Sequence, residues 1–179
     1  MPDPEAQTDE HLADLSDHAI IAGYGIPGRA VADRLAGAGV PFCVVEMNPQ
    51  TVMRSAGTGV RIIAGDAADE QTLRRAGIER ARLFAVTVPV DAAVLASITA
   101  ARRLNPTVRI WARCRYVSTG LQATRRGADE VIVAEQVVAT EFERLIDQGK
   151  VPPAPEAAGP SPTPAIVSHA QQEASAAPR

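Results

Sequence analysis

The stretch His18–Glu46, HAIIAGYGIPGRAVADRLAGAGVPFCVVE, decides the fold. It opens with the apolar run Ala19–Ala22, which predicts a buried strand. Glycines 23, 25 and 28 then form a GxGxxG turn that leads into a segment with helical spacing of its apolar residues. A second apolar run, Phe42–Val45, ends in the acidic Glu46, about 20 residues after the turn. Together these features predict a nucleotide-binding βαβ unit, whereas the glycines alone could be ordinary turn and packing residues.

Each part of this unit has a chemical reason. Gly23 permits the tight turn, Gly25 allows close approach of a pyrophosphate, and Gly28 lets the helix pack against the strand. The positive end of the helix then faces the negative charge of the ligand. Glu46 can accept hydrogen bonds from both ribose hydroxyls, and its charge would repel a 2′-phosphate, so we expect NAD rather than NADP. Pro27 has no N–H and removes one phosphate donor.

The rest of the chain continues the alternation of apolar runs and helical segments. We expect strands at 60–64, 82–86, 108–112 and 130–133, and helices at 49–57, 69–77, 90–104, 117–126 and 135–146. This rhythm requires parallel pairing with right-handed crossovers. The expected fold is α/β, a Rossmann-like doubly wound six-stranded parallel sheet of order 3-2-1-4-5-6 with helices on both faces.

The carboxyl ends of the strands form the edge where open α/β sheets bind ligands. Five candidate residues are predicted to lie at this edge: Gly25, Glu46, Asp66, Thr87 and Arg113. Asp66 has an alternative reading, as part of a turn that leads into a helix cap.

Composition narrows the class of protein. Apolar residues make up 46% of the 179, but aromatic residues only 3%, and the net charge is −3. The basic residues are dispersed, so we expect no nucleic-acid partner, and Arg102–Arg103 and Arg125–Arg126 are expected to be solvated helix faces. No membrane span and no signal peptide are recognisable, which predicts a soluble, cytoplasmic protein. Cys43 is expected to be a core residue, and no metal-ligand spacing occurs.

The two ends differ from the middle. Residues 1–17 are acidic and contain no Lys or Arg, so we expect a flexible arm. Residues 148–179 are rich in Pro and Ala and hold seven of the 14 prolines, which predicts a disordered tail. The expected globular domain therefore spans 18–147.

An ordered series of short motifs in that domain resembles the N-terminal lobe of RCK domains, also called KTN or TrkA-N domains. These are cytosolic regulators of potassium channels, potassium uptake systems and Kef-type potassium/proton antiporters. The series consists of the glycine turn, Glu46 with Asn48, Gly65–Ala67 with Leu73, Ala85–Thr87, Ala112–Arg113 and Gly127–Ile132.

The resemblance implies a lobe that binds NAD(H) or an adenine nucleotide (ATP, ADP or AMP), performs no chemistry and gates an ion pathway by rearranging paired lobes. The matching positions imply roles for nine candidate residues. Gly23, Gly25 and Gly28 would hold the phosphates, Glu46 the ribose, Asp66 and Ala67 the adenine, and Thr87 and Arg113 the distal half. The ninth, Ile26, stands beside the phosphates where the family often has Arg.

The resemblance also implies partners. No membrane span and no second regulatory lobe are recognisable, so we expect action on a separate membrane-embedded potassium channel or cation/proton antiporter. In the family, the helix after the sixth strand often packs across a dimer. The apolar stripe of 135–146 suits such a contact, in a homodimer or higher oligomer, but it suits packing on its own sheet equally well.

An enzyme is the alternative function, namely a small NAD-dependent oxidoreductase. No histidine is expected at a carboxyl strand end, and no residue stands out as a catalytic acid or base.

Overall fold

The computed structural model describes residues 15–150 of the chain. The predicted arm and tail lie mostly outside these residues. At the start of the described range, Leu15 is buried against the core.

The described residues form a single six-stranded parallel sheet in the predicted order β3-β2-β1-β4-β5-β6. Its strands are β1 (Ala19–Ala22), β2 (Phe42–Glu46), β3 (Ile62–Ala64), β4 (Leu83–Val86), β5 (Arg109–Cys114) and β6 (Glu130–Val133). The helices are α2 (Ile26–Gly37), α3 (Pro49–Ser55), α4 (Glu70–Arg75), α5 (Asp91–Leu104), α6 (Val117–Arg125) and α7 (Ala134–Asp147). A short 3-10 helix, η1 (Ile78–Arg80), was not predicted.

Local sequence explains where these elements begin. All residues of β1 and β4 are buried, as their uniformly apolar sequences require at the centre of a covered sheet. Asn48 and Asp69 cap α3 and α4 by accepting hydrogen bonds from the N–H groups of Gln50 and Thr72. The hydrogen bonds from Thr72 lower the pKa of Asp69.

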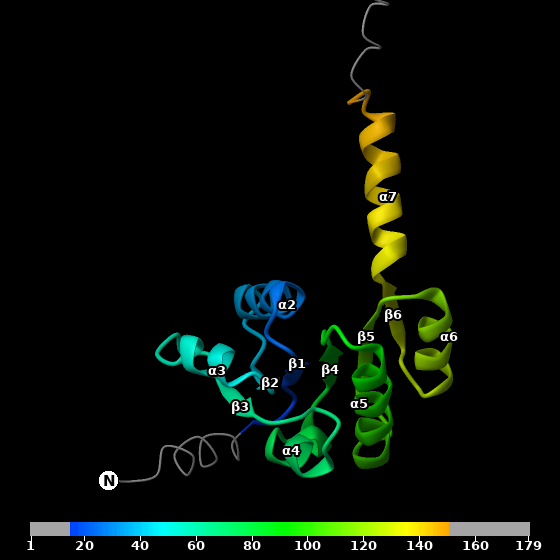
Figure 1. The fold of residues 1–179 in the computed structure, drawn as a ribbon. Coiled ribbons are helices and arrows are strands. Elements are labelled where there is room, and N and C mark those ends of the chain that lie inside the picture. The colour runs from blue at the N-terminus through cyan, green and yellow to red at the C-terminus, as the bar shows by residue number, and fades with distance from the viewer. Residues whose placement is uncertain (1–14, 151–179) are drawn as a thin grey trace, which may run out of the picture.

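The helices form two layers of unequal extent (Figure 1). α2 and α3 pack over the β1–β3 side, whereas α4, α5 and α6 line the other face as far as β6. On the α2 side, the face of β4–β6 is therefore only partly covered: β4 is buried, but β5 and β6 leave large side chains exposed. Trp111 and Ile132 on this face are 38% and 53% exposed.

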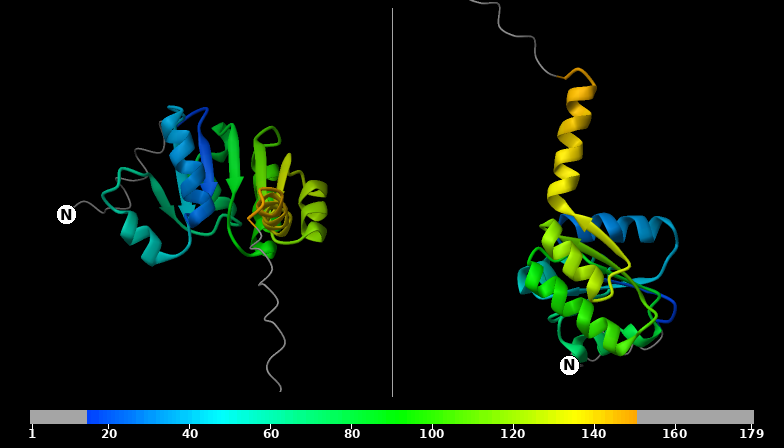
Figure 2. Two further views of the ribbon diagram at one scale, coloured as in Figure 1. Left: turned by 90° about the horizontal axis from the view of Figure 1, so that it is seen from above. Right: turned by 90° about the vertical axis from the view of Figure 1, so that its right-hand side faces the viewer.

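α7 is the helix that could have covered this face, but it projects away from the body (Figure 2). None of its residues is buried. Of the two alternatives for this helix, packing on its own sheet is therefore wrong, and the helix leaves Val137, Val138, Phe142 and Ile146 exposed.

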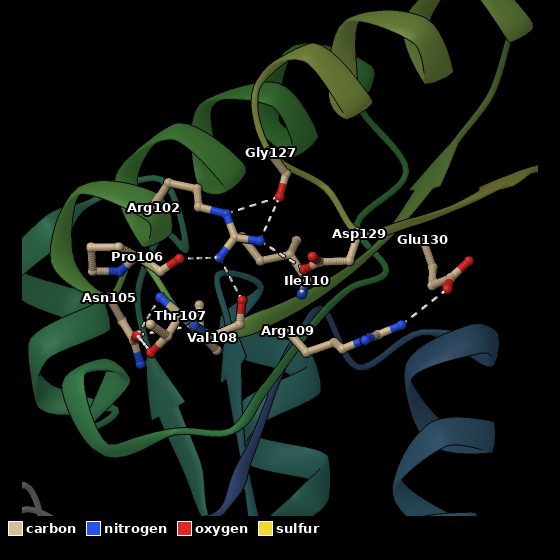
Figure 3. Close-up of polar contacts among 10 residues, drawn as sticks. All are labelled: Arg102, Asn105, Pro106, Thr107, Val108, Arg109, Ile110, Gly127, Asp129 and Glu130. Carbon is tan, nitrogen blue, oxygen red and sulfur yellow. Dashed lines mark hydrogen bonds and ion pairs between the residues drawn. The ribbon is translucent and has the colours of Figure 1, made fainter.

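At the amino-terminal edge of the sheet, polar side chains form hydrogen bonds and ion pairs that join neighbouring segments (Figure 3). The guanidinium of Arg102 donates to the carbonyls of Gly127, Pro106 and Val108 at 2.6–2.9 Å and pairs with Asp129 at 2.7 Å. Arg102 was expected on a solvated helix face, and this expectation is wrong, because its side chain is only 22% exposed.

Both cysteines are buried and unpaired. Burial raises the pKa of the Cys43 thiol to about 12, and burial with the nearby charge of Asp91 raises the pKa of Cys114. Cys43 is thus a core residue as predicted, and neither thiol is activated as a nucleophile.

Candidate nucleotide-binding site

The glycine turn joins β1 to α2 in a tight, closely packed form. Gly23 has a φ of +90°, and its N–H donates to the carbonyl of Val45 at 2.8 Å. A Cβ on Gly28 would lie 2.0 Å from the carbonyl oxygen of Gly23, so only glycine fits there. A Cβ on Gly25 would meet only Pro27, at 4.0 Å. The space above Gly25 is thus open to a ligand.

Glu46 links this turn to the end of β2. Its carboxylate accepts the N–H of Tyr24 through Oε2 and the N–H of Asn48 through Oε1, both at 2.7 Å. The carboxylate is therefore held in one orientation at the carboxyl edge. Each oxygen keeps a further lone pair with which it can accept a hydroxyl hydrogen bond.

Ile26 and Arg29 flank the amino end of α2. Ile26 is its first residue and is 88% exposed, so it presents an apolar side chain beside the turn. The Arg29 Nε donates to the carbonyl of Tyr24 at 3.2 Å, and its guanidinium lies 5.4 Å from the centre of the Tyr24 ring. A cation thus stands at this end of the helix despite the isoleucine at position 26.

Asp66 and Ala67 follow β3. Asp66 is exposed, and its Oδ1 accepts the N–H of Ala68 at 2.9 Å, which makes the turn that leads to the Asp69 cap. Ala67 is only 5% exposed because its methyl group packs in the core. The side chain of Ala67 is therefore not available to a ligand.

Thr87 and Arg113 follow or end the neighbouring strands. The Thr87 hydroxyl lies 2.9 Å from the carbonyl of Ala22 and 3.0 Å from that of Gly23. Arg113 is half-buried in an apolar groove of about 310 Å³ on the open face of β4–β6. The groove also includes Pro27, Trp111 and Ile132, and α7 contributes Ala134, Val137 and Val138.

The register of the sheet brings the predicted residues to one edge. Ala22 pairs with Val45 and Val86, and Val86 pairs with Ala112. The residues that follow these positions, including Gly23, Glu46, Thr87 and Arg113, therefore share the carboxyl edge. Reasoning from sequence missed the groove, although the alternation of Trp111 and Arg113 along β5 could have indicated it.

Within residues 15–150, no three His, Cys, Asp or Glu side chains gather as metal ligands. No helix in that range is long and apolar enough to cross a bilayer.

This sheet order, with its alternating helices, defines a Rossmann-like α/β domain. Residues 19–134 match the family model of the TrkA-N domain. The chain belongs to the TrkA-N family, the nucleotide-binding N-terminal domain of RCK regulators of potassium channels and antiporters.

Two curated relatives are transport proteins. The chain is 31% identical over 143 residues to the putative cation/proton antiporter YbaL of Escherichia coli K12, covering 80% of this chain and 25% of the relative. It is 27% identical over 138 residues to potassium channel protein 1 of Methanocaldococcus jannaschii, covering 76% and 41%. The chain thus spans less than half the length of either relative.

Solved structures agree with this assignment. The TrkA-N domain of YbaL from Escherichia coli superposes with a TM-score of 0.71 at 30% identity, covering 74% of this chain and 98% of that one. The NAD-bound GsuK channel gives 0.65 at 31% identity, covering 76% and 24%. The AMP-bound Kef C-terminal domain of Shewanella denitrificans gives 0.62 at 25% identity, covering 74% and 81%.

Proposed function

We propose that this chain binds NAD(H) or an adenine nucleotide and thereby regulates potassium transport by a membrane-embedded channel or cation/proton antiporter. The observation that carries the proposal is the open glycine turn with Glu46 fixed beside it. A ligand phosphate at the amino end of α2 and a ribose on Glu46 would use the two features together.

The glycine turn and Glu46 together fit a ligand that carries both a phosphate and a ribose. A phosphate and an adenosine ribose are shared by NAD, NADH, ATP, ADP and AMP, and the relatives described above were solved with NAD and AMP. In this proposal Gly23, Gly25, Gly28 and Ile26 surround the phosphates. Asp66 and the backbone of Ala67 lie by the adenine, and Arg113 faces the distal half.

Calorimetric titration with NADH, NAD, ATP, ADP and AMP tests this proposal. We expect at least one to bind with a micromolar or lower dissociation constant. Glu46→Ala should weaken binding by about 1–2 kcal/mol, because charge-assisted hydrogen bonds to the ribose are lost. Glu130→Ala, an exposed glutamate at the opposite edge, is the matched control and should bind as the wild type does. Absence of binding by all five nucleotides would remove the proposal.

We also propose that the bound nucleotide is a signal and undergoes no reaction. Membership of a family of regulatory domains supports this view over an NAD-dependent oxidoreductase. The two functions differ in one measurement, the oxidation of NADH in the presence of a panel of small carbonyl substrates. Turnover that depends on the protein would favour the oxidoreductase.

For the oligomer, we propose a homodimer in which α7 of one copy covers the open face of β4–β6 of its partner. The support is reciprocal: α7 has no buried residue, while the groove beside it exposes Trp111 and Ile132. A two-fold arrangement would bury both surfaces of each copy at once.

Sedimentation equilibrium can test this dimer. Phe142→Glu places a charge on the apolar stripe of α7 and should shift the protein to monomer. Thr140→Glu places the same charge on the opposite side of the helix and should leave the dimer intact. A wild-type protein that stays monomeric up to high concentration would contradict the arrangement.

For the cell, we propose a cytoplasmic location beside the transporter. Cells without the gene should retain potassium abnormally, and wild-type protein should restore retention. If Glu46→Ala restores it equally well, nucleotide binding is not the regulatory signal.

A further inference from the structure

Thr87 makes three contacts with the end of β1. Its backbone N–H donates to the carbonyl of Ala22 at 2.9 Å, and its hydroxyl lies 2.9 Å from the same oxygen and 3.0 Å from the carbonyl of Gly23. A hydroxyl has a single proton to donate. Here that proton is directed to carbonyls of the chain itself, in contrast to the ligand contact that the family resemblance implies.

The Gly23 carbonyl depends on this hydroxyl. Among residues 15–150, Thr87 is its one hydrogen-bond donor. Gly28 is packed against the same oxygen, since a Cβ at Gly28 would lie 2.0 Å from it and 2.9 Å from the Thr87 hydroxyl. Loss of the hydroxyl would leave a carbonyl in a crowded position without a partner, which is costly.

The glycine turn is thereby held by hydrogen bonds to both neighbouring strands, β2 and β4. On the β2 side, the N–H of Gly23 bonds to Val45 and the N–H of Tyr24 bonds to Glu46. On the β4 side, the hydroxyl of Thr87 holds the turn. Because glycine has wide conformational freedom, a turn with three glycines needs such tethers to keep its N–H groups aimed at a phosphate.

We infer that Thr87 is a positioning residue for nucleotide binding, whose hydroxyl donates its proton to the chain rather than to the ligand and so holds the turn at residues 23–28 in its binding conformation. This inference rests on the proposed function, because it concerns the same nucleotide site. Affinities for two ligands distinguish this positioning role from a direct contact between Thr87 and the ligand. A contact with the distal half of a dinucleotide matters only to NADH, whereas a misplaced turn affects every ligand with a phosphate there.

Three variants and two measurements test the inference. Thr87→Val keeps the shape and removes the hydroxyl, Thr87→Ser restores the hydroxyl, and Thr99→Val removes a comparable hydroxyl that bonds to Leu95 within α5. Calorimetry gives the affinities for ADP and NADH. Amide exchange by NMR, on the ligand-free protein, reports how firmly the N–H of Tyr24 is held.

We expect Thr87→Val to weaken ADP and NADH by the same factor, about tenfold, and to speed exchange at Tyr24. Thr87→Ser and Thr99→Val should match the wild type in both measurements. Loss of NADH affinity with unchanged ADP affinity would overturn the inference and restore Thr87 as a ligand contact. Unchanged exchange at Tyr24 would also overturn it.

Failure of the proposed function is separable from these outcomes. If the wild-type protein binds neither ADP nor NADH, the nucleotide proposal fails. The exchange measurement, which needs no ligand, still decides whether the Thr87 hydroxyl holds the turn.

Discussion

At the amino-terminal edge of the sheet, polar side chains form hydrogen bonds with other groups of the chain. At the carboxyl edge, some polar side chains keep donors or acceptors with which they can bind a ligand. Asn105 is 7% exposed and bonds to the carbonyls of Ile78 and Ala81 and to the N–H groups of Thr107 and Val108. Arg113, at the other edge, is half-buried, and its guanidinium has no hydrogen-bond or ion-pair partner within residues 15–150.

This difference shows how one sheet separates stability from function. Buried donors and acceptors stabilise a fold only when they are paired, and the side chains of Arg102 and Asn105 at the amino-terminal edge meet that condition. At the carboxyl edge the open space above Gly25 lies beside an oriented carboxylate. Substitutions at the first edge should therefore change stability, and substitutions at the second should change ligand affinity.

The glycine turn is the one place where both effects should meet. Gly28→Ala brings a methyl group to 2.0 Å from the Gly23 carbonyl, a backbone atom that cannot move alone. We expect a loss of about 3 kcal/mol or more in the free energy of unfolding, measured by urea denaturation.

Gly25→Ala is the matched control for that change, since φ at Gly25 is −76° and the new methyl group has space. Its stability should stay within about 0.5 kcal/mol of the wild type, while nucleotide affinity should fall by about tenfold or more. If both alanine substitutions destabilise the protein equally, the space above Gly25 is not open as described.

Asn105→Ala should have the next largest effect. It leaves buried carbonyls and N–H groups without partners, so we expect a loss of about 2–4 kcal/mol in urea denaturation, with nucleotide affinity unchanged. Asn48→Ala provides the comparison, because this exposed N-cap contributes about 1 kcal/mol. If the Asn105 variant is as stable as the Asn48 variant, the buried hydrogen bonds of Asn105 do not stabilise this edge.

Arg102→Lys keeps the charge but loses the planar fork that reaches the carbonyls of Gly127 and Val108. A loss of about 1–2 kcal/mol is expected in thermal or urea unfolding. Arg103→Lys changes a neighbouring side chain that is 71% exposed and should be neutral. Equal stability of the two variants would show that charge alone, without the fork, holds this edge.

His18 should give the smallest effect, and one that depends on pH. The imidazole is fully buried, with Nε2 2.8 Å from the carbonyl of Ala76 and no partner for Nδ1 among the described residues. Burial lowers the pKa of His18 below its ordinary 6.5, assisted by the charges of Arg80 and Arg61 and opposed by the bond to Ala76 and by Asp17. The unfolded chain therefore takes up a proton first as pH falls.

Stability should accordingly be complete above pH 6.5 and decline below it. Asp69 and Glu141 do not contribute in this window, because their pKa values are lowered from 3.8 and 4.5. Thermal unfolding at about pH 5 and about pH 7.5 measures the decline. His18→Gln should flatten it, and an unchanged slope in that variant would exclude His18 as its source.

Sequence was sufficient for the sheet order and for the edge on which Gly25, Glu46, Thr87 and Arg113 lie. Both follow from the alternation of apolar runs with helical segments, and from the rule that parallel strands end on the same side. The glycine motif supplied the position of the turn.

Sequence was insufficient where partners lie far apart along the chain. Arg102 meets Gly127 and Asp129, which are 25 and 27 residues away, and nothing in its neighbourhood distinguishes it from Arg103. The direction of the Thr87 hydroxyl depends on how close β1 and β4 lie. Similarly, the apolar stripe of α7 was readable, but where the helix points depends on Val133 and the first turn after it.

The projection of α7 has a consequence for how the molecule should respond to dilution. A lone helix of 14 residues is marginal in water, and this one receives almost no support from the body. Its helical content is therefore linked to whatever covers it, so that docking and coil-to-helix ordering are a single equilibrium. Circular dichroism recorded over a range of protein concentrations should show ellipticity rising as copies meet, which makes the backbone of this segment a built-in reporter of assembly.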